Sequence, residues 1–225
     1  MDKADKWKFW ISLSFRLLLV GAIVVSLFTL NWLNLFMAIA TMFLTFVPSM
    51  LEKKFEIDYP GEFEIILLLF LYASLFLGEI HRFYDYFWWW DLMLHGISGV
   101  IMAIFALSIV SLVSNAKNIK IKLNPLFIAL FSLCFAISMG VFWEIFEYSM
   151  DLIFKTAMQG NGLVDTMWDL IADSVGATII AIIGYFYIKG TLKGPLNFME
   201  KYEKKFLTQN PHIFNKHLKI KKRNK

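Results

Sequence analysis

Long apolar stretches alternate with short polar ones along the chain, and this pattern predicts its secondary structure. Six of the stretches contain roughly 20 residues, the length that a helix needs to cross about 30 Å of hydrocarbon. Leu, Ile and Phe fill these stretches at helical length, without the ten-residue alternation of membrane strands, so helices are favoured over a β-barrel. We predict an all-α polytopic membrane protein with six transmembrane helices. The predicted spans are 9–30, 33–51, 63–80, 92–114, 126–150 and 166–188.

The composition agrees with a membrane location. Of the 225 residues, 58% are hydrophobic and 17% are aromatic, a balance that a bilayer accommodates and a soluble core of this size does not. The single cysteine, Cys134, excludes a disulfide framework within the chain and a metal site built on several thiolates. We predict one membrane domain, residues 1–188, followed by a cytoplasmic tail, residues 189–225.

Basic residues in the short connections predict the orientation of the helices. One side of the membrane receives eight lysines before the tail, whereas the other side receives only Arg82 and Lys155. The eight are Lys3, Lys6, Lys8, Lys53, Lys54, Lys117, Lys120 and Lys122. Because positive charge marks the cytoplasmic side, both termini are expected in the cytoplasm of a cell whose plasma or inner membrane holds the protein.

The predicted tail is strongly basic, with eleven Lys and Arg residues against Glu200 and Glu203. Such a segment beside a bilayer is attracted to anionic lipids, at about 1 kcal/mol for each nearby charge. The alternative is an ordinary basic tail that only follows the positive-inside rule. Nucleic acid is not an expected partner, because the chain has no recognisable nucleic-acid module. The expected partner is the lipid bilayer, and the pattern favours no particular oligomeric state.

Eight acidic or imidazole side chains interrupt the last three apolar stretches, all toward the predicted outer side. They are Asp91, His95, Glu144, Glu147, Asp151, Asp165, Asp169 and Asp173. An ionisable residue within a membrane span indicates a functional site by default. With a rise of 1.5 Å per residue, these side chains fall into three layers along the helices.

The outermost layer, or rim, contains Asp91, Asp151 and Asp165, which we predict as rim or outer supporting residues of a site. His95, Glu147 and Asp169 form a second layer about 6 Å deeper, and Glu144 and Asp173 a third layer about 10–12 Å below the rim. The acids on each helix share one face. Three glycines lie on or beside the same faces, and we expect them to let the helices approach closely. These packing residues are Gly99, Gly140 and Gly176.

Simpler structural roles remain open for several of these side chains. Asp91 and Asp165 begin helices, where a carboxylate caps free N–H groups and meets the positive end of the helix dipole. His95 fits a hydrogen-bonded core histidine as well as a metal ligand or proton carrier. Trp143 and Trp168 each adjoin an acid, but their helical positions predict contact with lipid or with other helices.

Charge narrows the chemistry of the deeper layers. An ionised acid at the centre of a membrane helix costs about 2.5–3.5 kcal/mol, so these acids require protons, a water-filled cavity or a bound metal. Carboxylates with one imidazole suit Mg²⁺, Mn²⁺ or Zn²⁺. We predict His95, Asp169 and Asp173 as candidate metal ligands, with Glu144 and Glu147 as candidate catalytic bases.

Three motifs in residues 90–178 resemble the YjdF-like family of bacterial inner-membrane proteins, which have six spans and no assigned activity. The motifs are D-x-x-x-H-x-x-x-G from Asp91, G-V-F-W-E-I-F-E-Y from Gly140 and V-D-T-M-W-D-L-I-A-D-S-V-G-A from Val164. More remotely, the order of the acidic helices is similar to the VanZ-like family, which is linked to low-level glycopeptide resistance. A VanZ-type span would have Gln or Arg near Glu147 and Asn at Asp173, so the resemblance implies an arrangement rather than a reaction.

Three kinds of function follow from these residues. The first is a metal-dependent enzyme or binding site that acts on a lipid or envelope precursor at the outer leaflet. The second is a proton- or cation-coupled transporter, in which Glu144, Glu147, Asp169 and Asp173 form a relay. The third is a structural membrane protein whose polar residues only hold three helices together.

Overall fold

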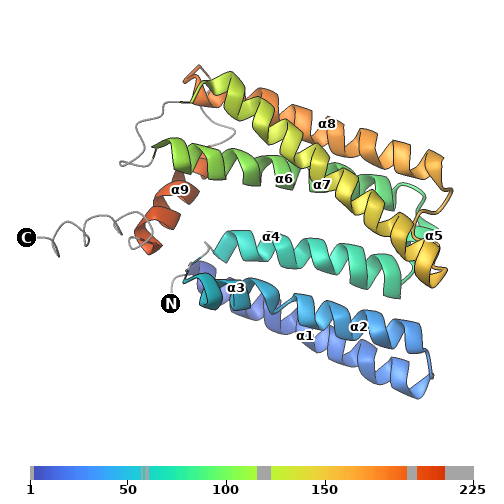
Figure 1. The fold of residues 1–225 in the computed structure, drawn as a ribbon. Helices are drawn as coiled ribbons and strands as arrows, with labels where there is room; N and C mark the ends of the chain where they lie inside the picture. Colours follow the sequence, from blue (N-terminus) through green and yellow to red (C-terminus); the bar gives the residue numbers. More distant parts are fainter. Residues whose placement is uncertain (1–2, 57, 59–60, 116–122, 192–196, 211–225) are drawn as a thin grey trace, which may run out of the picture. The chain divides into compact units, whose positions relative to one another are not determined.

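Every regular element of the described chain is helical. The computed structural model describes residues 3–56, 58, 61–115, 123–191 and 197–210, and these contain no strand. The elements are α1 (Lys3–Phe28), α2 (Trp32–Leu44), α3 (Val47–Phe55), α4 (Gly61–Leu71), the π-helix η1 (Tyr72–Ile80), α5 (Phe83–Tyr86), α6 (Trp90–Asn115), α7 (Pro125–Phe154), α8 (Leu163–Ile188) and α9 (Asn197–Gln209) (Figure 1). The predicted all-α class is confirmed. The predicted loop lysines Lys117, Lys120 and Lys122 lie outside the described residues.

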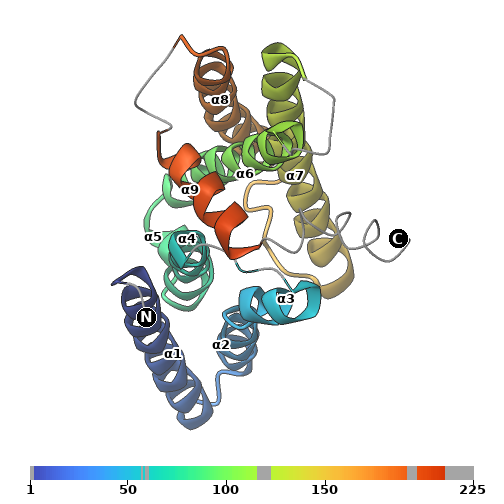
Figure 2. The ribbon, with the colours of Figure 1, turned by 90° about the vertical axis from the view of Figure 1, so that its left-hand side faces the viewer.

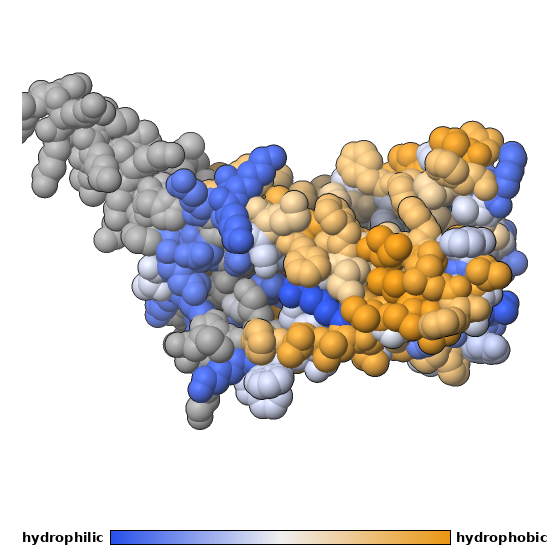
Figure 3. All heavy atoms as spheres, turned by 90° about the horizontal axis from the view of Figure 1, so that it is seen from below, coloured by the Kyte–Doolittle hydropathy of each residue, from blue (hydrophilic) through white to orange (hydrophobic). Residues whose placement is uncertain are grey.

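Six helical segments are long and apolar enough to cross a membrane, as the sequence predicts. They are Phe9–Phe28, Trp32–Phe55, Gly61–Ile80, Trp90–Ser111, Pro125–Phe154 and Leu163–Ile188. Large apolar side chains on their outer faces are exposed, as expected where lipid replaces water as the solvent. On the face drawn in Figure 3, hydrophobic residues gather along the middle of the helices and hydrophilic residues toward their ends.

Two of the six spans are not continuous α-helices. The second span breaks between α2 and α3, where Pro48 stands in the first turn of α3 and cannot donate a backbone hydrogen bond. Arg16 of α1 stabilises this break, because its guanidinium donates to the Thr45 side chain at 3.2 Å and to the Thr45 carbonyl at 3.1 Å. The third span changes from α4 into η1, whose wider turns run to Ile80.

The chain divides into two compact units, and each is described by itself. The first unit contains residues 1–91 and 205–215, and the second contains residues 92–204 and 216–225. Helices α1 to α5 therefore belong to the first unit. The second unit contains α6 from Leu92 onward, α7, α8 and the first part of α9, and its three long helices lie together as one group (Figure 2).

Small residues bring the three long helices of the second unit close together. Gly176 of α8 lies so near the Gly96 carbonyl of α6 that a methyl group there would overlap it, and Gly99 lies equally close to the Asp173 backbone. Ser132 of α7 donates to the Ala103 carbonyl of α6 at 2.7 Å. In membranes, such close backbone approach and interhelical hydrogen bonds replace the hydrophobic effect as the source of helix association.

The end of the described chain is tied to the connection before α4. Asn210 is fully buried, donates to the Asp58 carbonyl at 2.8 Å and accepts the Asp58 N–H at 2.7 Å. Lys205 pairs with Glu62 at 3.0 Å. These contacts place residues 205–210 in the first unit. Most of the basic residues of the predicted tail lie in 211–225, outside the described residues, so the 1–188 and 189–225 division and the anionic-lipid contact remain predictions.

A pair of glycine substitutions tests the packing of α6 against α8. Gly176→Ala should lower the free energy of unfolding by roughly 1–3 kcal/mol, because the new methyl group meets backbone that cannot move aside. Gly96→Ala is the matched control, since its new methyl group would make only an ordinary 3.9 Å contact with the Ala172 carbonyl. Thermal unfolding of the two variants in detergent provides the comparison. Equal melting temperatures would contradict the close contact at Gly176.

Candidate functional site

The candidate site lies where α6 and α8 begin and α7 ends. Five of the predicted side chains are almost completely buried there, with exposed fractions between 1% and 6%. They are His95, Glu144, Glu147, Asp169 and Asp173. Each faces the inside of the second unit because the acids of every helix share one face, as the spacing predicts. Burial of this degree among membrane helices requires close polar neighbours for each group.

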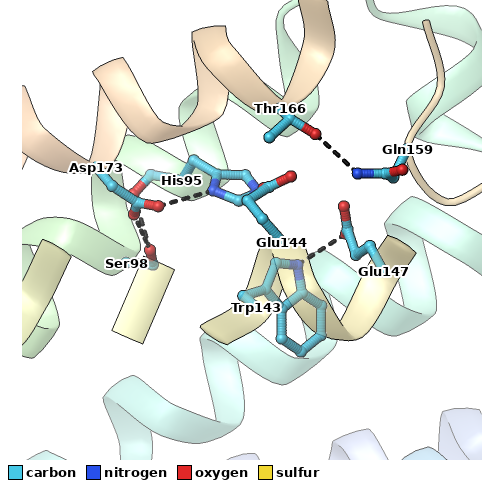
Figure 4. A network of polar contacts seen from close by, with 8 residues as sticks. All are labelled: His95, Ser98, Trp143, Glu144, Glu147, Gln159, Thr166 and Asp173. Atoms are coloured by element: carbon cyan, nitrogen blue, oxygen red, sulfur yellow. Dashed lines mark hydrogen bonds and ion pairs between the residues drawn. The ribbon is translucent and has the colours of Figure 1, made fainter. Parts of the chain in front are cut away.

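Asp173 of α8 is the most deeply buried of these acids and binds two groups of α6 (Figure 4). Ser98 donates its hydroxyl to Asp173 Oδ1 at 2.5 Å. His95 Nδ1 lies 3.0 Å from Asp173 Oδ2. The carboxylate therefore contacts two residues about one turn apart on the neighbouring helix and joins α6 to α8 by side-chain bonds.

Glycines make room for this carboxylate. A methyl group at Gly140 of α7 would overlap Asp173 Oδ2, and one at Gly99 of α6 would overlap the Asp173 backbone. Gly140 was expected to let two helix backbones approach closely. Its missing side chain instead leaves space for the Asp173 carboxylate. The three helices meet around Asp173 because each supplies either a small residue or a hydrogen-bond donor at this level.

The imidazole of His95 lies between two carboxylates (Figure 4). Its Nδ1 faces Asp173, and its Nε2 is 3.7 Å from Glu144 Oε1 on α7. An ionised carboxylate only accepts hydrogen bonds, so it places the proton of a neutral ring on Nδ1. The Nε2 lone pair of that tautomer then points to the side of the ring where Glu144 lies.

A possible metal-binding group surrounds the same imidazole. Asp91, His95 and Asp169 each offer one ligand atom, and these atoms all lie within 4.8 Å of one another. Asp91 is carried by α6 itself, one helical turn before His95. Two carboxylates and an imidazole at this separation could coordinate one ion of the kind that oxygen and nitrogen ligands prefer.

Glu147 of α7 receives a hydrogen bond that the sequence analysis missed. Trp143 donates its indole N–H to Glu147 Oε1 at 2.8 Å (Figure 4). The sequence analysis expected Trp143 to contact lipid or other helices, and nearly half of its side chain is exposed, but this bond to an acid was not predicted. The spacing of four residues between them places both on neighbouring turns, and this signal could have predicted the contact.

The rim acid Asp151 is engaged by the connection between α7 and α8. Its carboxylate accepts the Thr156 hydroxyl at 2.6 Å and the backbone N–H groups of Met158 and Gln159 at 2.8 and 3.0 Å. Local structure thus explains an acid at the C-terminal end of a helix, where the dipole disfavours negative charge.

A second rim acid, Asp165, lies directly after this connection, in the first turn of α8. Gly160, with φ of +45°, leaves room for its carboxylate, and a side chain there would press against Asp165 Oδ2. Gln159 then bonds the Thr166 hydroxyl at 2.9 Å (Figure 4). The connection is therefore held to both helices that it joins, beside the deeper acids.

Arg82 lies in the connection that follows the third span. It forms an exposed ion pair with Asp85 at 2.6 Å, and this hydrogen bond raises the pKa of Arg82 above its ordinary value. Both groups lie in the first unit, so the charge of Arg82 is engaged locally by its own connection.

Residues 11–190 match the model of a protein family described as predicted membrane protein, DUF2238. The chain belongs to this family. DUF2238 is the YjdF family that the three motifs resemble, so that expectation is confirmed, whereas the likeness to VanZ-like proteins remains a similarity in motif order. Every candidate site residue of this DUF2238 protein lies within the matched region.

A relative of this DUF2238 protein is an uncharacterized protein of Thermotoga maritima, which is 27% identical over 140 residues. The similar region covers 62% of this chain and 70% of the relative. No solved structure matches the chain. The family description is that of a membrane protein, and neither it nor the name of the relative adds an activity, so the chemistry must be argued from the site.

The bond between Ser98 and Asp173 can be tested by removing one hydroxyl. Ser98→Ala should lower the free energy of unfolding by about 0.6–2 kcal/mol, the usual range for a polar contact between membrane helices. Ser138→Ala is the control, because that exposed hydroxyl bonds only the Cys134 carbonyl of its own helix. Denaturant unfolding in mixed micelles gives both values. A loss at Ser98 no greater than at Ser138 would contradict the geometry.

Proposed function

We propose that the second unit of this DUF2238 protein binds a divalent metal ion inside the membrane and uses it on the headgroup of a lipid or lipid-linked envelope precursor. The observation that carries the proposal is the position of His95 between Asp173 and Glu144. An imidazole whose Nδ1 faces a carboxylate is the arrangement that metal-binding histidines commonly show. The carboxylate sets the tautomer and makes the other ring nitrogen a better ligand.

The geometry favours a particular division of roles among the acids. Asp173 was predicted as a ligand, but its contacts with His95 and Ser98 suit an orienting role behind the imidazole. Asp169 and Asp91 each offer a carboxylate oxygen within 4.8 Å of a ring nitrogen of His95, and these oxygens are the candidate ligands beside the imidazole. Glu144, which lies near His95 Nε2, is placed to share the ion or to accept a proton from a water bound to it.

Charge supports a cation at this place. Residues 140–176 contain six acids and one basic residue, Lys155. Five buried ionisable groups lie together, and an ion of charge +2 would lower the cost of keeping their carboxylates ionised among membrane helices. Oxygen ligands with one imidazole suit Mg²⁺, Mn²⁺ or Zn²⁺. Such an ion would polarise a phosphate or carbonyl oxygen and acidify a bound water, with Glu144 or Glu147 as the base.

Packing beyond the site favours chemistry at one side of the membrane over transport. Ala103, Ala136, Ala177 and Ile180 form a buried apolar cluster along the same three helices. A further apolar cluster, around Leu107 and Ile128, follows it toward the other end of these helices. A path for protons or ions needs ionisable groups or water through both halves, and the buried polar side chains beside these clusters, Ser108, Ser111 and Ser132, are not ionisable.

The bias of basic residues supports a location for the activity. It assigns the beginnings of α6 and α8 to the outer side of the plasma or inner membrane, with both termini in the cytoplasm. The substrate would accordingly be a component of the outer leaflet. This orientation is testable independently by labelling of single cysteines in intact cells.

Titration of the purified protein with Mn²⁺, Mg²⁺ and Zn²⁺ by calorimetry tests the metal site. We expect one ion per chain for the wild type and no measurable binding for His95→Ala. Asp173→Asn should weaken binding roughly 10- to 100-fold, because outer partners of metal ligands typically contribute that much. Glu62→Gln removes an exposed acid of the first unit and is the control that should bind normally.

Three results would decide against this proposal. Absence of binding by the folded wild type would remove the metal site. Equal binding by wild type and His95→Ala would place the ion elsewhere. Normal binding by Asp173→Asn would show that the carboxylate does not support the imidazole, and a polar contact between helices would then be its whole role.

A further inference from the structure

An apolar groove lies on the outside of the second unit, along the line where α6 meets α8. It has a volume of about 370 Å³. Leu92, Gly96 and Val100 of α6 form one wall, and Trp168, Ala172 and Gly176 of α8 form part of the other. Because these helices span the membrane, the groove faces hydrocarbon rather than water.

Missing side chains create the depth of this groove. Gly96 on one wall and Ala172 and Gly176 on the other have no side chain or only a methyl group, and the two walls meet where Gly176 lies against the Gly96 carbonyl. The small residues of α8 are therefore in contact with α6. The larger side chains of Ile171, Val175 and Ile179 line the groove farther from this contact. A side chain at position 96 would project into open space, since its first carbon would meet only the Ala172 carbonyl at 3.9 Å.

The groove begins at the level of the candidate metal site, on the outer side of the same two helices, and has the length of one leaflet. At its start, Leu92 directly follows Asp91 in the sequence, and Trp168 directly precedes Asp169. From Trp168 to Ile179 it follows α8 for about 16 Å at 1.5 Å per residue. Half of the hydrocarbon core is about 15 Å thick, so the groove matches the depth of a single lipid tail.

We infer that the groove holds the hydrocarbon tail of a lipid whose phosphate headgroup binds the metal ion near His95. The inference rests on the proposed function and adds the class of substrate, a phosphate monoester on a long hydrocarbon chain. The tail fits because the lining is apolar along its whole length, from Leu92 and Trp168 at the level of the site to Val100 and Ile179.

The phosphate follows from the charge of the site. Divalent ions such as Mg²⁺ are usually held by one or two carboxylates together with phosphate oxygens of the substrate. Without the ion, Asp169 and Glu144 would repel a phosphate, because both are acids beside the same imidazole. Binding of the lipid should therefore require the metal, and the tail and headgroup should be recognised together.

A photoreactive lipid tests this inference. The full-length protein is placed in phosphatidylcholine nanodiscs that contain a trace of phosphatidic acid with a diazirine in its tail. With Mn²⁺ present, illumination should label peptides that contain residues 92–100 or 168–179, and chelation of Mn²⁺ should lower this labelling several-fold. A photoreactive phosphatidylcholine gives the background expected of any lipid-facing surface.

Variants of matched size separate the groove from the surrounding surface. Gly96→Leu fills the groove and should lower the labelling about fivefold, which corresponds to roughly 1 kcal/mol of binding. Ser174→Leu adds a side chain of equal size in the neighbouring groove of about 460 Å³ on α8 and should leave the labelling unchanged. Calorimetry with Mn²⁺ on both variants verifies that the metal site is intact.

The possible outcomes distinguish this inference from the proposed function. If the wild type binds no Mn²⁺, the proposed function fails and the inference fails with it. If Mn²⁺ binds but the labelling ignores the metal, lies elsewhere or survives Gly96→Leu, only the inference is overturned. A wild type that is dimeric, with a Gly96→Leu variant that is monomeric, would overturn it in favour of a second copy of the chain in the groove.

Discussion

The buried carboxylate of Asp173 is the constraint on which the second unit depends. An ionised acid in a membrane helix costs about 2.5–3.5 kcal/mol unless its neighbours compensate, and Asp173 is only 1% exposed. Ser98 and His95 provide the compensating contacts from one face of α6. Around these contacts α6 and α7 both approach α8 so closely that side chains larger than hydrogen do not fit at Gly99 of α6 or Gly140 of α7.

This close approach has consequences in two directions from the site. Toward the middle of the helices, small residues continue as Ala103, Ala136 and Ala177, which pack tightly and exclude water. On the outside of the α6 and α8 contact, the same lack of side chains leaves the groove over Gly96 and Gly176. The acid, the sealed core and the apolar groove are therefore physical results of one packing arrangement.

The sequence predicts the spans well because membrane hydropathy is a strong signal at helical length. It does not predict the break before α3, where Arg16 of another helix binds Thr45. It also does not predict the wide turns of η1. Periodicity also predicts which faces carry the acids. The depth of each site residue along its helix is predicted less well, because counting residues from the rim assumes that the three helices are parallel and begin or end at the same level.

His95 shows the limit of that counting. The layers assign it to the level of Glu147 and Asp169, yet its ring contacts the deeper Asp173 and faces Glu144. A long side chain on a helix reaches across a full turn, and helix tilt adds a shift that the sequence does not contain. Asp151 differs for another reason, since two of its three partners are the backbone N–H groups of Met158 and Gln159, which residue type does not predict.

The number of buried polar groups argues against a purely structural role for the site. A single contact between membrane helices contributes about 0.6–2 kcal/mol, and the bond from Ser98 to Asp173 with the neighbouring imidazole would suffice to hold α6 against α8. Glu144, Glu147 and Asp169 add three further buried acids at the same place. Each, when ionised, adds a cost of about 2.5–3.5 kcal/mol, which exceeds the gain from one contact, so helix association alone would not favour their presence. A cation shared among them changes that balance, because it lowers the cost of all the carboxylates at once.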